Sequence, residues 1–298
     1  MTIDLERAAS FMAAHARVLD RRRFDLLVGD GAPARLRTSV LDAVDAYRNP
    51  DGGYGWGLEP DLRAWGSQPA AALHAFEAMA DAAPATSPHA VGLCDWLDAV
   101  THADGGLAFA LPIDDPAACA PFWVDADPDA SSLQITAAVA ARAHRVARHD
   151  AEVAHHPWLA TVTRYCIDAI RALDAAPFAY VLSFAVQFAD AAADSTDEAR
   201  GVLDHLGPFV PHDGALVVAG GAEGETLHLL DFAPEPDRPV RALLSGDAVA
   251  ADLDRLAGLQ QPDGGWVVDF DSFSPAASLE WRGYATVRAV ATLRANGR

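Results

Sequence analysis

An Asp-Gly-Gly tripeptide returns along this chain at nearly regular intervals, and this repetition restricts the possible folds more than any other feature. Asp51-Gly52-Gly53 recurs as Asp104-Gly105-Gly106 and Asp263-Gly264-Gly265, with the shorter Asp213-Gly214 between them. The steps are 53, 109 and 50 residues. Because 109 is close to twice 53, we expect one copy near residue 158 to have lost its glycines. A period of about 50 residues is typical of repeat architectures, and it predicts about five repeats of roughly 53 residues.

Two kinds of helix flank these tripeptides. Apolar residues at three- and four-residue spacing precede the first and last copies, as in Val40, Leu41 and Val44 or Val249, Leu253 and Leu256, which predicts amphipathic helices. The segments that follow, such as "PAAALHAFEAMADAA" from residue 69, are apolar nearly all round. Such helices are enclosed by others, so we expect them to offer almost only Ala, Val, Leu and Phe to the interior.

The alternation of a one-sided and an enclosed helix predicts two concentric rings. We therefore expect an all-α fold, an (α/α)6 toroid of inner and outer helices, as a single domain over residues 1–298. The helix expected over residues 4–24 can supply a sixth member. The stretch "GALVVAGG" at 214–221 is the one convincing strand signal. An open solenoid would bury the same helix faces.

The glycine tripeptides are expected to reverse the chain between an outer and an inner helix. Glycine reaches positive φ without steric cost, and an aspartate side chain can close such a turn on the backbone. The aromatic residues Trp56, Phe109 and Trp266 follow the glycines, and we expect them to pack each turn onto the next unit. Ser67 and the Ser131-Ser132 pair stand where the caps of inner helices belong.

Composition excludes several functional classes. The net charge of -20, from 42 acidic and 22 basic residues, argues against a nucleic-acid partner. Three distant cysteines, Cys94, Cys119 and Cys166, fit neither a disulfide framework nor a CxxC metal knuckle, so a cytoplasmic location is expected. No stretch is long and apolar enough to predict a transmembrane segment.

Two segments resemble a known family. "LQQPDGGW" at 259–266 is similar to the QW motif of squalene-hopene cyclases and to the related repeat of protein prenyltransferase β-subunits. "YRNPDGGYGWG" at 47–57 resembles the same motif with Arg48 and Asn49 in place of the glutamine pair, and "EWRGYATVRAVATL" at 280–293 resembles the inner helix that follows it. The resemblance implies the terpenoid cyclase and protein prenyltransferase toroid, with a central apolar cavity that handles isoprenoid chains.

The family's two chemistries direct attention to particular residues. Class II cyclases protonate an alkene with the middle aspartate of a DxDD motif. No full copy exists here; "DADPDASS" holds Asp125, Asp127 and Asp129, and "DFDS" holds Asp269 and Asp271. Clustered acids raise one another's pKa and keep a proton available. The same residues also fit solvated turns and helix caps.

The zinc chemistry of prenyltransferases finds less support. Its Asp-x-Cys pattern occurs at neither Cys94 nor Cys166, which lie on predicted outer helices, although His228 could point inward. We therefore expect no metal and no cofactor, with magnesium entering only if the ligand is a diphosphate.

Polar residues gather at the expected N-terminal ends of the inner helices, which all open to one end of a barrel. We expect the acids to come from Asp129, Asp269, Asp271 and Glu280. The ligand-binding residues are expected to be Glu59, Asp61, Trp65, Gln68, Gln134, Tyr180, His228, Trp281, Arg282 and Tyr284.

Three functions remain open at this point. The first is an isoprenoid-handling enzyme that protonates an alkene. An acidic rim without lysine favours a neutral terpenoid over a prenyl diphosphate as its ligand. The exception is a site where Arg63, Arg282 or a divalent metal offsets the negative charge. The second is a carbohydrate-active (α/α)6 hydrolase or lyase. The third is a non-catalytic protein that binds a small apolar ligand.

Overall fold

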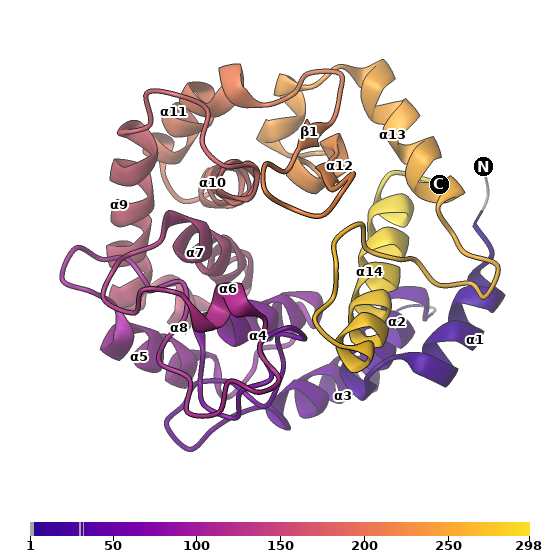
Figure 1. Ribbon diagram of the computed structural model, residues 1–298, viewed down its shortest axis with the longest axis horizontal. Helices are drawn as coiled ribbons and strands as arrows, with labels where there is room; N and C mark the ends of the chain where they lie inside the picture. The colour runs from indigo at the N-terminus through magenta and orange to yellow at the C-terminus, as the bar shows by residue number, and fades with distance from the viewer. Residues whose placement is uncertain (1–2, 30, 32) are drawn as a thin grey trace.

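Twelve α-helices of the computed structural model, which describes residues 3–29, 31 and 33–298, alternate between an outer and an inner ring (Figure 1). The outer helices are α1 (Leu5–His15), α3 (Ala34–Asp45), α5 (Ala90–Val100), α9 (Pro157–Arg171), α11 (Asp197–Leu206) and α13 (Gly246–Gly258). The inner helices are α2 (Val18–Val28), α4 (Pro69–Asp81), α7 (Leu133–Ala147), α10 (Ala179–Ala192), α12 (Leu229–Phe232) and α14 (Pro275–Ala295). The predicted all-α toroid is confirmed.

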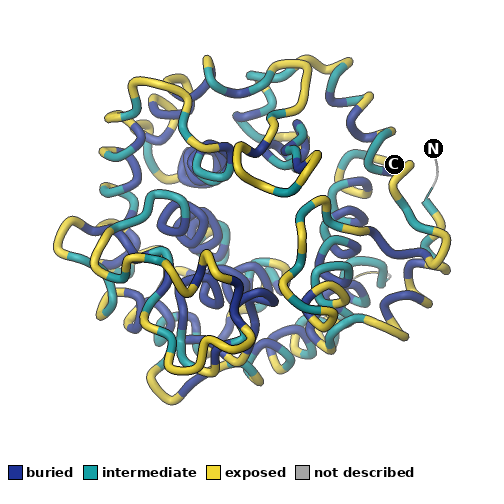
Figure 2. Tube along the Cα trace, viewed as in Figure 1, coloured by how far each residue is buried: buried dark blue, intermediate teal, exposed yellow. Residues whose placement is uncertain are grey.

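Short helices and one pair of strands lie in the connections between the two rings. They are α6 (Pro121–Val124), α8 (Ala151–Ala154), the 3-10 helices Gly207–Phe209 and Pro239–Leu243, and the antiparallel pair β1 (Leu216–Val217) and β2 (Thr226–Leu227). The segments that lead into α4, α7, α12 and α14 are the longest connections. The connections into α7 and α12 are the more exposed ones, the connection into α4 is mostly buried, and the inner helices α4, α7 and α10 are largely buried (Figure 2). We call the end of the ring where the inner helices begin the mouth.

The three complete glycine tripeptides share one geometry. The side chain of Asp51, Asp104 or Asp263 accepts a hydrogen bond from the amide of the second glycine at 2.9, 3.0 and 3.1 Å. The first glycine has φ of 94°, 92° and 96° in the three turns. This left-handed conformation favours glycine strongly.

Each turn packs against the next outer helix of the ring. A Cβ atom on Gly53 would meet Trp96 of α5, one on Gly106 would meet Tyr165 of α9, and one on Gly265 would meet Phe11 of α1. The third contact joins the end of the chain to its beginning. Gln260 reinforces it, because its side chain both accepts from the amide of Asp4 and donates to the carbonyl of Asp4, at 2.8 Å each. The ring is therefore closed.

The aromatic residues after the glycines differ in burial. Trp266 is 2% exposed and donates from its indole nitrogen to the carbonyl of Leu256 at 2.8 Å, as expected for a residue that joins repeats. Phe109 is partly buried and stacks on Trp123. Trp56 is 58% exposed, so its expected packing role is wrong, and the preceding aromatic residue, Tyr54, is buried in its place.

Other local expectations need correction. The helix expected over 4–24 is two helices, because Ala16 and Arg17 are extended, and Arg17 binds Asp20 and the carbonyl of Leu58. The region near residue 158 is the start of the outer helix α9, so that unit makes its outer-to-inner connection at 172–178 instead. Ser67 and Ser131 do not cap their helices; their hydroxyls donate to the carboxylates of Asp51 and Asp104.

We expect Gly264→Ala to lower the free energy of unfolding by about 2 to 4 kcal/mol, because alanine at positive φ is strained and its Cβ would overlap the carbonyl of Arg7. Gly201→Ala in α11, where the added Cβ meets nothing within 4 Å, is the control and should be neutral or slightly stabilising. Urea denaturation of both variants measures the difference. A Gly264→Ala variant as stable as the wild-type protein would contradict the close contact between this turn and α1.

Trp266→Ala should cost about 3 to 5 kcal/mol of stability, because it empties a buried site at the junction of α13, α14 and α1. Trp56→Ala is the matched control and should cost less than about 1 kcal/mol, since Trp56 is exposed and donates one hydrogen bond to Asn49. Thermal melts followed by circular dichroism distinguish the two. A large loss in Trp56→Ala alone would reverse the assignment.

Candidate functional site

A buried charge network joins α4 and α7 to the connection that precedes α4. His74 of α4 contacts Glu59 through Nε2 at 2.8 Å and Glu77 through Nδ1 at 3.1 Å. Arg142 of α7 donates from Nε to the same Glu77 at 3.2 Å. All four residues are less than one tenth exposed. The two carboxylates and two cationic groups balance one another inside the ring.

The protonation states in this network follow from its contacts. Both ring nitrogens of His74 face carboxylates, so two N–H donors, and therefore an imidazolium, satisfy the geometry best. Burial alone would lower the pKa of His74, but the hydrogen bonds to Glu59 and Glu77 outweigh it and raise that pKa. For Glu77, burial is opposed by His74 and by the cations of Arg142 and Arg23, which hold its pKa well below the usual value. Glu77 is thus a fixed negative charge.

Tyr284 extends the network to α14. Its hydroxyl donates to Glu77 at 3.0 Å, and its ring lies edge-on to those of His74 and Trp281, with centroids 5.3 and 5.5 Å apart. Burial, with the charge of Glu77, raises the pKa of Tyr284 to about 12, so it stays a donor at neutral pH. Residues from α4, α7 and α14 therefore meet at one carboxylate.

Asp61 lies beside this network and is 3% exposed. Its two carboxyl oxygens accept hydrogen bonds from the indole of Trp281 at 2.7 Å and from the amide of Phe273 at 2.8 Å. Burial raises the pKa of Asp61, with Glu59 adding to the rise, although the two hydrogen bonds and the Arg63 cation oppose it. Asp61 is therefore a buried carboxyl group with a raised pKa at the mouth of the ring.

Aromatic rings and one ion pair surround Asp61. Trp281 is half-buried and packs edge-on against Phe270 and Tyr284. Glu280, on the preceding position of α14, forms an ion pair with Arg63 at 2.6 Å. The sequence-predicted residues Glu59, Asp61, Glu280, Trp281 and Tyr284 thus come together in one place.

A second group of predicted residues lies by the β-hairpin. Tyr180 donates to Glu225 at 2.6 Å, and Asp269 accepts from the amide of Thr226 at 3.2 Å. Loss of hydration, with smaller contributions from Asp231 and Glu225, raises the pKa of Asp269. His228 precedes α12, and its Nδ1 lies 4.0 Å from Asp252.

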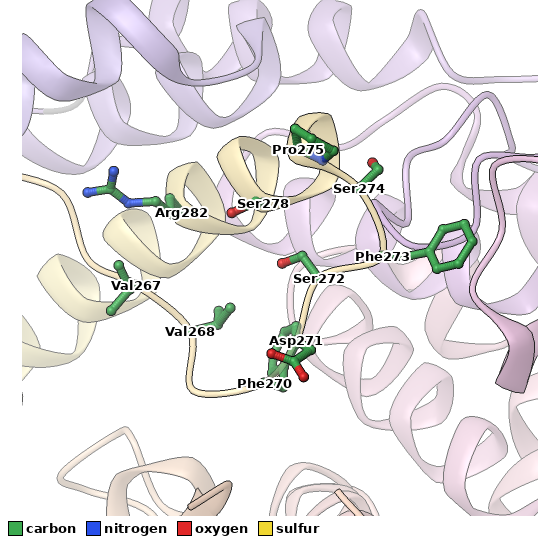
Figure 3. A pocket seen from close by; sticks show the side chains of 10 residues that line it. All are labelled: Val267, Val268, Phe270, Asp271, Ser272, Phe273, Ser274, Pro275, Ser278 and Arg282. Atoms are coloured by element: carbon green, nitrogen blue, oxygen red, sulfur yellow. The ribbon is translucent and has the colours of Figure 1, made fainter. Parts of the chain in front are cut away.

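Asp271 lines a shallow groove of about 460 Å³ between the 267–274 segment and the first turns of α14 (Figure 3). The groove walls include Phe270, Phe273, Ser278 and Arg282. A groove of about 400 Å³ beside α7, α9 and α10 is lined by His144, Thr163 and Ser195. Neither groove is lined by residues of the charge network.

The remaining predicted residues lie apart from Asp61 or serve the scaffold. Asp129 and Trp65 are exposed, and Gln134 is half-buried. The side chain of Gln68 holds the backbone of Leu111 by two hydrogen bonds, at 2.8 and 3.1 Å. Arg282 binds Asp263 at 2.8 Å and lies over the ring of Phe11, so it secures the third glycine turn.

Sequence reasoning missed His74, Glu77 and Arg142. The expectation that the inner helices offer almost only apolar side chains to the interior is wrong at these positions. The sequence does contain an indication of this network. His74 and Glu77 are three residues apart, on one face of a largely apolar helix. Isolated buried charges need partners, and here the partners come from distant parts of the chain.

No family model matches this sequence, and no curated protein matches it. Solved structures resemble this chain over nearly its whole length, as two examples show. A protein from Actinoplanes shares 14% identity at a TM-score of 0.60, over 99% of this chain and 98% of its own. An alanine variant of the type II terpene cyclase MstE from Scytonema, in complex with its product merosterolic acid A, shares 12% identity at a TM-score of 0.54, over 97% and 93%. This chain has a terpenoid cyclase-like fold.

Two negative findings concern the described residues of this cyclase-like toroid. Among them, no three or more His, Cys, Asp or Glu side chains are grouped so that they could hold a metal ion. None of the described helices combines the length and apolar character that crossing a membrane requires. The three cysteines are buried with free thiols, and Cys94 and Cys166 lie on outer helices as predicted.

Glu77→Gln should lower the free energy of unfolding by about 3 to 5 kcal/mol at pH 7, because it leaves Arg142 and His74 buried without their shared carboxylate. The pKa of Glu77 is depressed in the folded protein, so its stabilisation is present above the unfolded pKa and is lost as pH falls through the folded one. The difference in unfolding free energy between the variant and the wild type should therefore become smaller as the pH is lowered. The exposed Glu152→Gln is the control, with an effect below about 0.5 kcal/mol. A gap that widens at low pH would contradict the assignment.

Proposed function

We propose that this protein is an isoprenoid-handling enzyme of the terpenoid cyclase type, and that Asp61 protonates an alkene of its ligand. The observation that carries the proposal is the environment of Asp61. It is a buried carboxyl group with a raised pKa, hydrogen-bonded by an indole and a backbone amide, beside aromatic rings at the mouth.

Burial and hydrogen bonding have complementary effects on such an acid. Burial disfavours the carboxylate and so favours the protonated form of Asp61, from which the proposed step starts. The donors on Trp281 and Phe273 already point at the carboxyl oxygens, so they stabilise the negative charge that forms when the proton leaves. The group can thus hold a proton in the resting state and still release it.

The proposed reaction conserves protons and electrons without a further reactant. The π electrons of the alkene form the new C–H bond with the proton of Asp61, which becomes a carboxylate, and the neighbouring carbon becomes cationic. Loss of a proton from a carbon next to the final cation forms a new alkene, and Asp61 then regains a proton. The rings of Trp281 and Phe270, which pack edge to face beside Asp61, offer the negative ring potential that stabilises a passing cation.

The fold neighbour supports the ligand class, since MstE is a type II terpene cyclase with merosterolic acid A as its product. A carbohydrate-active alternative fits the network less well. Such enzymes need two carboxyl groups free to flank a glycosidic bond, whereas Glu59 and Glu77 are bridged by His74. A non-catalytic role, with the ligand bound and no proton transferred, is an outcome that the experiment below distinguishes.

To test the proposal, the protein is incubated with squalene, farnesol and prenyl diphosphates, with and without Mg²⁺, and products are analysed by mass spectrometry. Asp61→Asn should reduce product formation by about 10²- to 10⁴-fold, the usual contribution of a positioned acid, with ligand binding retained. Asp269→Asn, Asp271→Asn, Asp129→Asn and Glu280→Gln test the other acids expected from the sequence. Asp114→Asn, an exposed acid on a connection at the mouth, is the control.

Full turnover in Asp61→Asn with loss in Asp269→Asn would move the acid to the β-hairpin group. Binding of isoprenoids without any product would favour a binding protein. Tight binding of an oligosaccharide, with no isoprenoid bound, would move the assignment to the carbohydrate class.

A further inference from the structure

Three guanidinium groups converge on Tyr284 and Glu77 inside the ring. Arg23 of α2 and Arg288 of α14 lie 5.6 and 5.8 Å from the centre of the Tyr284 ring. Arg142 of α7 donates to the carboxylate of Glu77, which also accepts from the Tyr284 hydroxyl. Positive charge is thus gathered at the interior of a chain whose net charge is -20.

The three arginines differ in how their charges are compensated. Arg23 is 7% exposed and donates to Asp81 at 2.7 Å, and Arg142, also buried, pairs with Glu77. Arg288 has a side chain that is 41% exposed, and its ion pair with Asp231 spans 3.8 Å, which is beyond hydrogen-bond distance. Arg288 is therefore an accessible cation on an inner helix, with donors left for another acceptor.

Arg142 and Arg288 extend from different inner helices and are close enough to repel. Burial lowers the pKa of Arg142, and the charges of Arg145 and Arg288 add to that effect, although Glu77 opposes it. Holding like charges near one another is unfavourable unless an anion lies between them or close by. Burial alone would lower the pKa of Arg288, but Tyr284, Asp231 and Glu77 raise it, so its guanidinium stays charged at the edge of the group.

The exposed face of α14 connects this group to the candidate acid site. Trp281, Ala285 and Arg288 are partly exposed and lie four and three residues apart, so they share one face of the helix. Arg288 follows Trp281 by seven positions, which is about 10 Å along a helix. A ligand along this face would place one end at Trp281 and Asp61 and the other at Arg288.

We propose that Arg288 binds an anionic head group of the ligand, a carboxylate or phosphate oxyanion, and that Arg142 strengthens the positive potential behind it. This inference rests on the proposed function for the identity of the apolar chain. It specifies the ligand as an isoprenoid acid or isoprenyl phosphate in preference to the alcohol or the hydrocarbon. A guanidinium matches both oxyanions because its N–H donors form a planar fork.

The test compares three ligands with one farnesyl chain, namely farnesol, farnesoic acid and farnesyl phosphate, by isothermal titration calorimetry. Wild-type protein should bind one or both anionic ligands at least about tenfold more tightly than farnesol. Arg288→Gln should abolish that preference and leave farnesol affinity unchanged, and Arg288→Lys should retain part of it. Arg294→Gln, an exposed arginine on the same helix, is the matched control.

A separate arm uses inorganic diphosphate alone and follows the melting temperature. Stabilisation of wild type that is absent in Arg288→Gln supports the anion site, even if no isoprenoid binds and the proposed function fails. Farnesol binding as tight as that of both anions, with no effect of Arg288→Gln, overturns this inference and leaves the proposed function standing. An equal diphosphate response in Arg288→Gln and wild type also overturns it.

Discussion

The contact between a glycine turn and the next outer helix is the interaction on which this architecture depends. In each complete turn the aspartate fixes the loop through the second glycine, and the two glycines let the backbone approach a helix where a Cβ would overlap it. Two such contacts join neighbours in sequence, and the third joins residues 263–265 to α1. The third is different in kind, because it converts a row of helix pairs into a ring. Because the ring closes, Asp61 and Trp281 lie within hydrogen-bond distance although 220 positions separate them in the sequence.

The ring and its turns were predictable from sequence because their determinants are local and repeated. Asp, two glycines and a following large residue specify the same backbone each time, and the helices on either side differ in how far their apolar residues extend around them. The interruption at Ala16 and Arg17 was not predictable, since neither residue breaks helices and the anchor is the distant carbonyl of Leu58. The unit near residue 158 makes its connection at 172–178 and not where the period placed it, because repeat lengths vary around the ring.

The candidate site was predictable in location and only partly in content. Polar residues at the starts of inner helices directed attention to the mouth, and Glu59, Asp61, Glu280, Trp281 and Tyr284 do meet there. Which acid is buried could not be read from the sequence, because Asp61 is enclosed by Phe273 and Trp281, 212 and 220 residues away. Likewise, His74, Glu77 and Arg142 look like isolated polar residues in apolar helices until the fold brings them together. Local patterns specify where helices begin, whereas burial and charge pairing are properties of the closed ring.

Closure also determines the order in which the fold can be completed during synthesis. A ribosome makes α1 before the other helices of the ring, and most of the residues that cover Phe11 and Met12, among them Leu253, Trp266 and Val290, are made after α3 to α11. Until then, Phe24 of α2 is the main buried apolar partner made so far for the apolar face of α1, whereas the pairs from α3 to α11 can form contacts with neighbours already made. Contacts between such distant segments are slow to form because a long loop must close. The apolar face of α1 therefore stays partly exposed through most of the synthesis of the ring. A chaperone, or a second unfinished chain, would bind at this face.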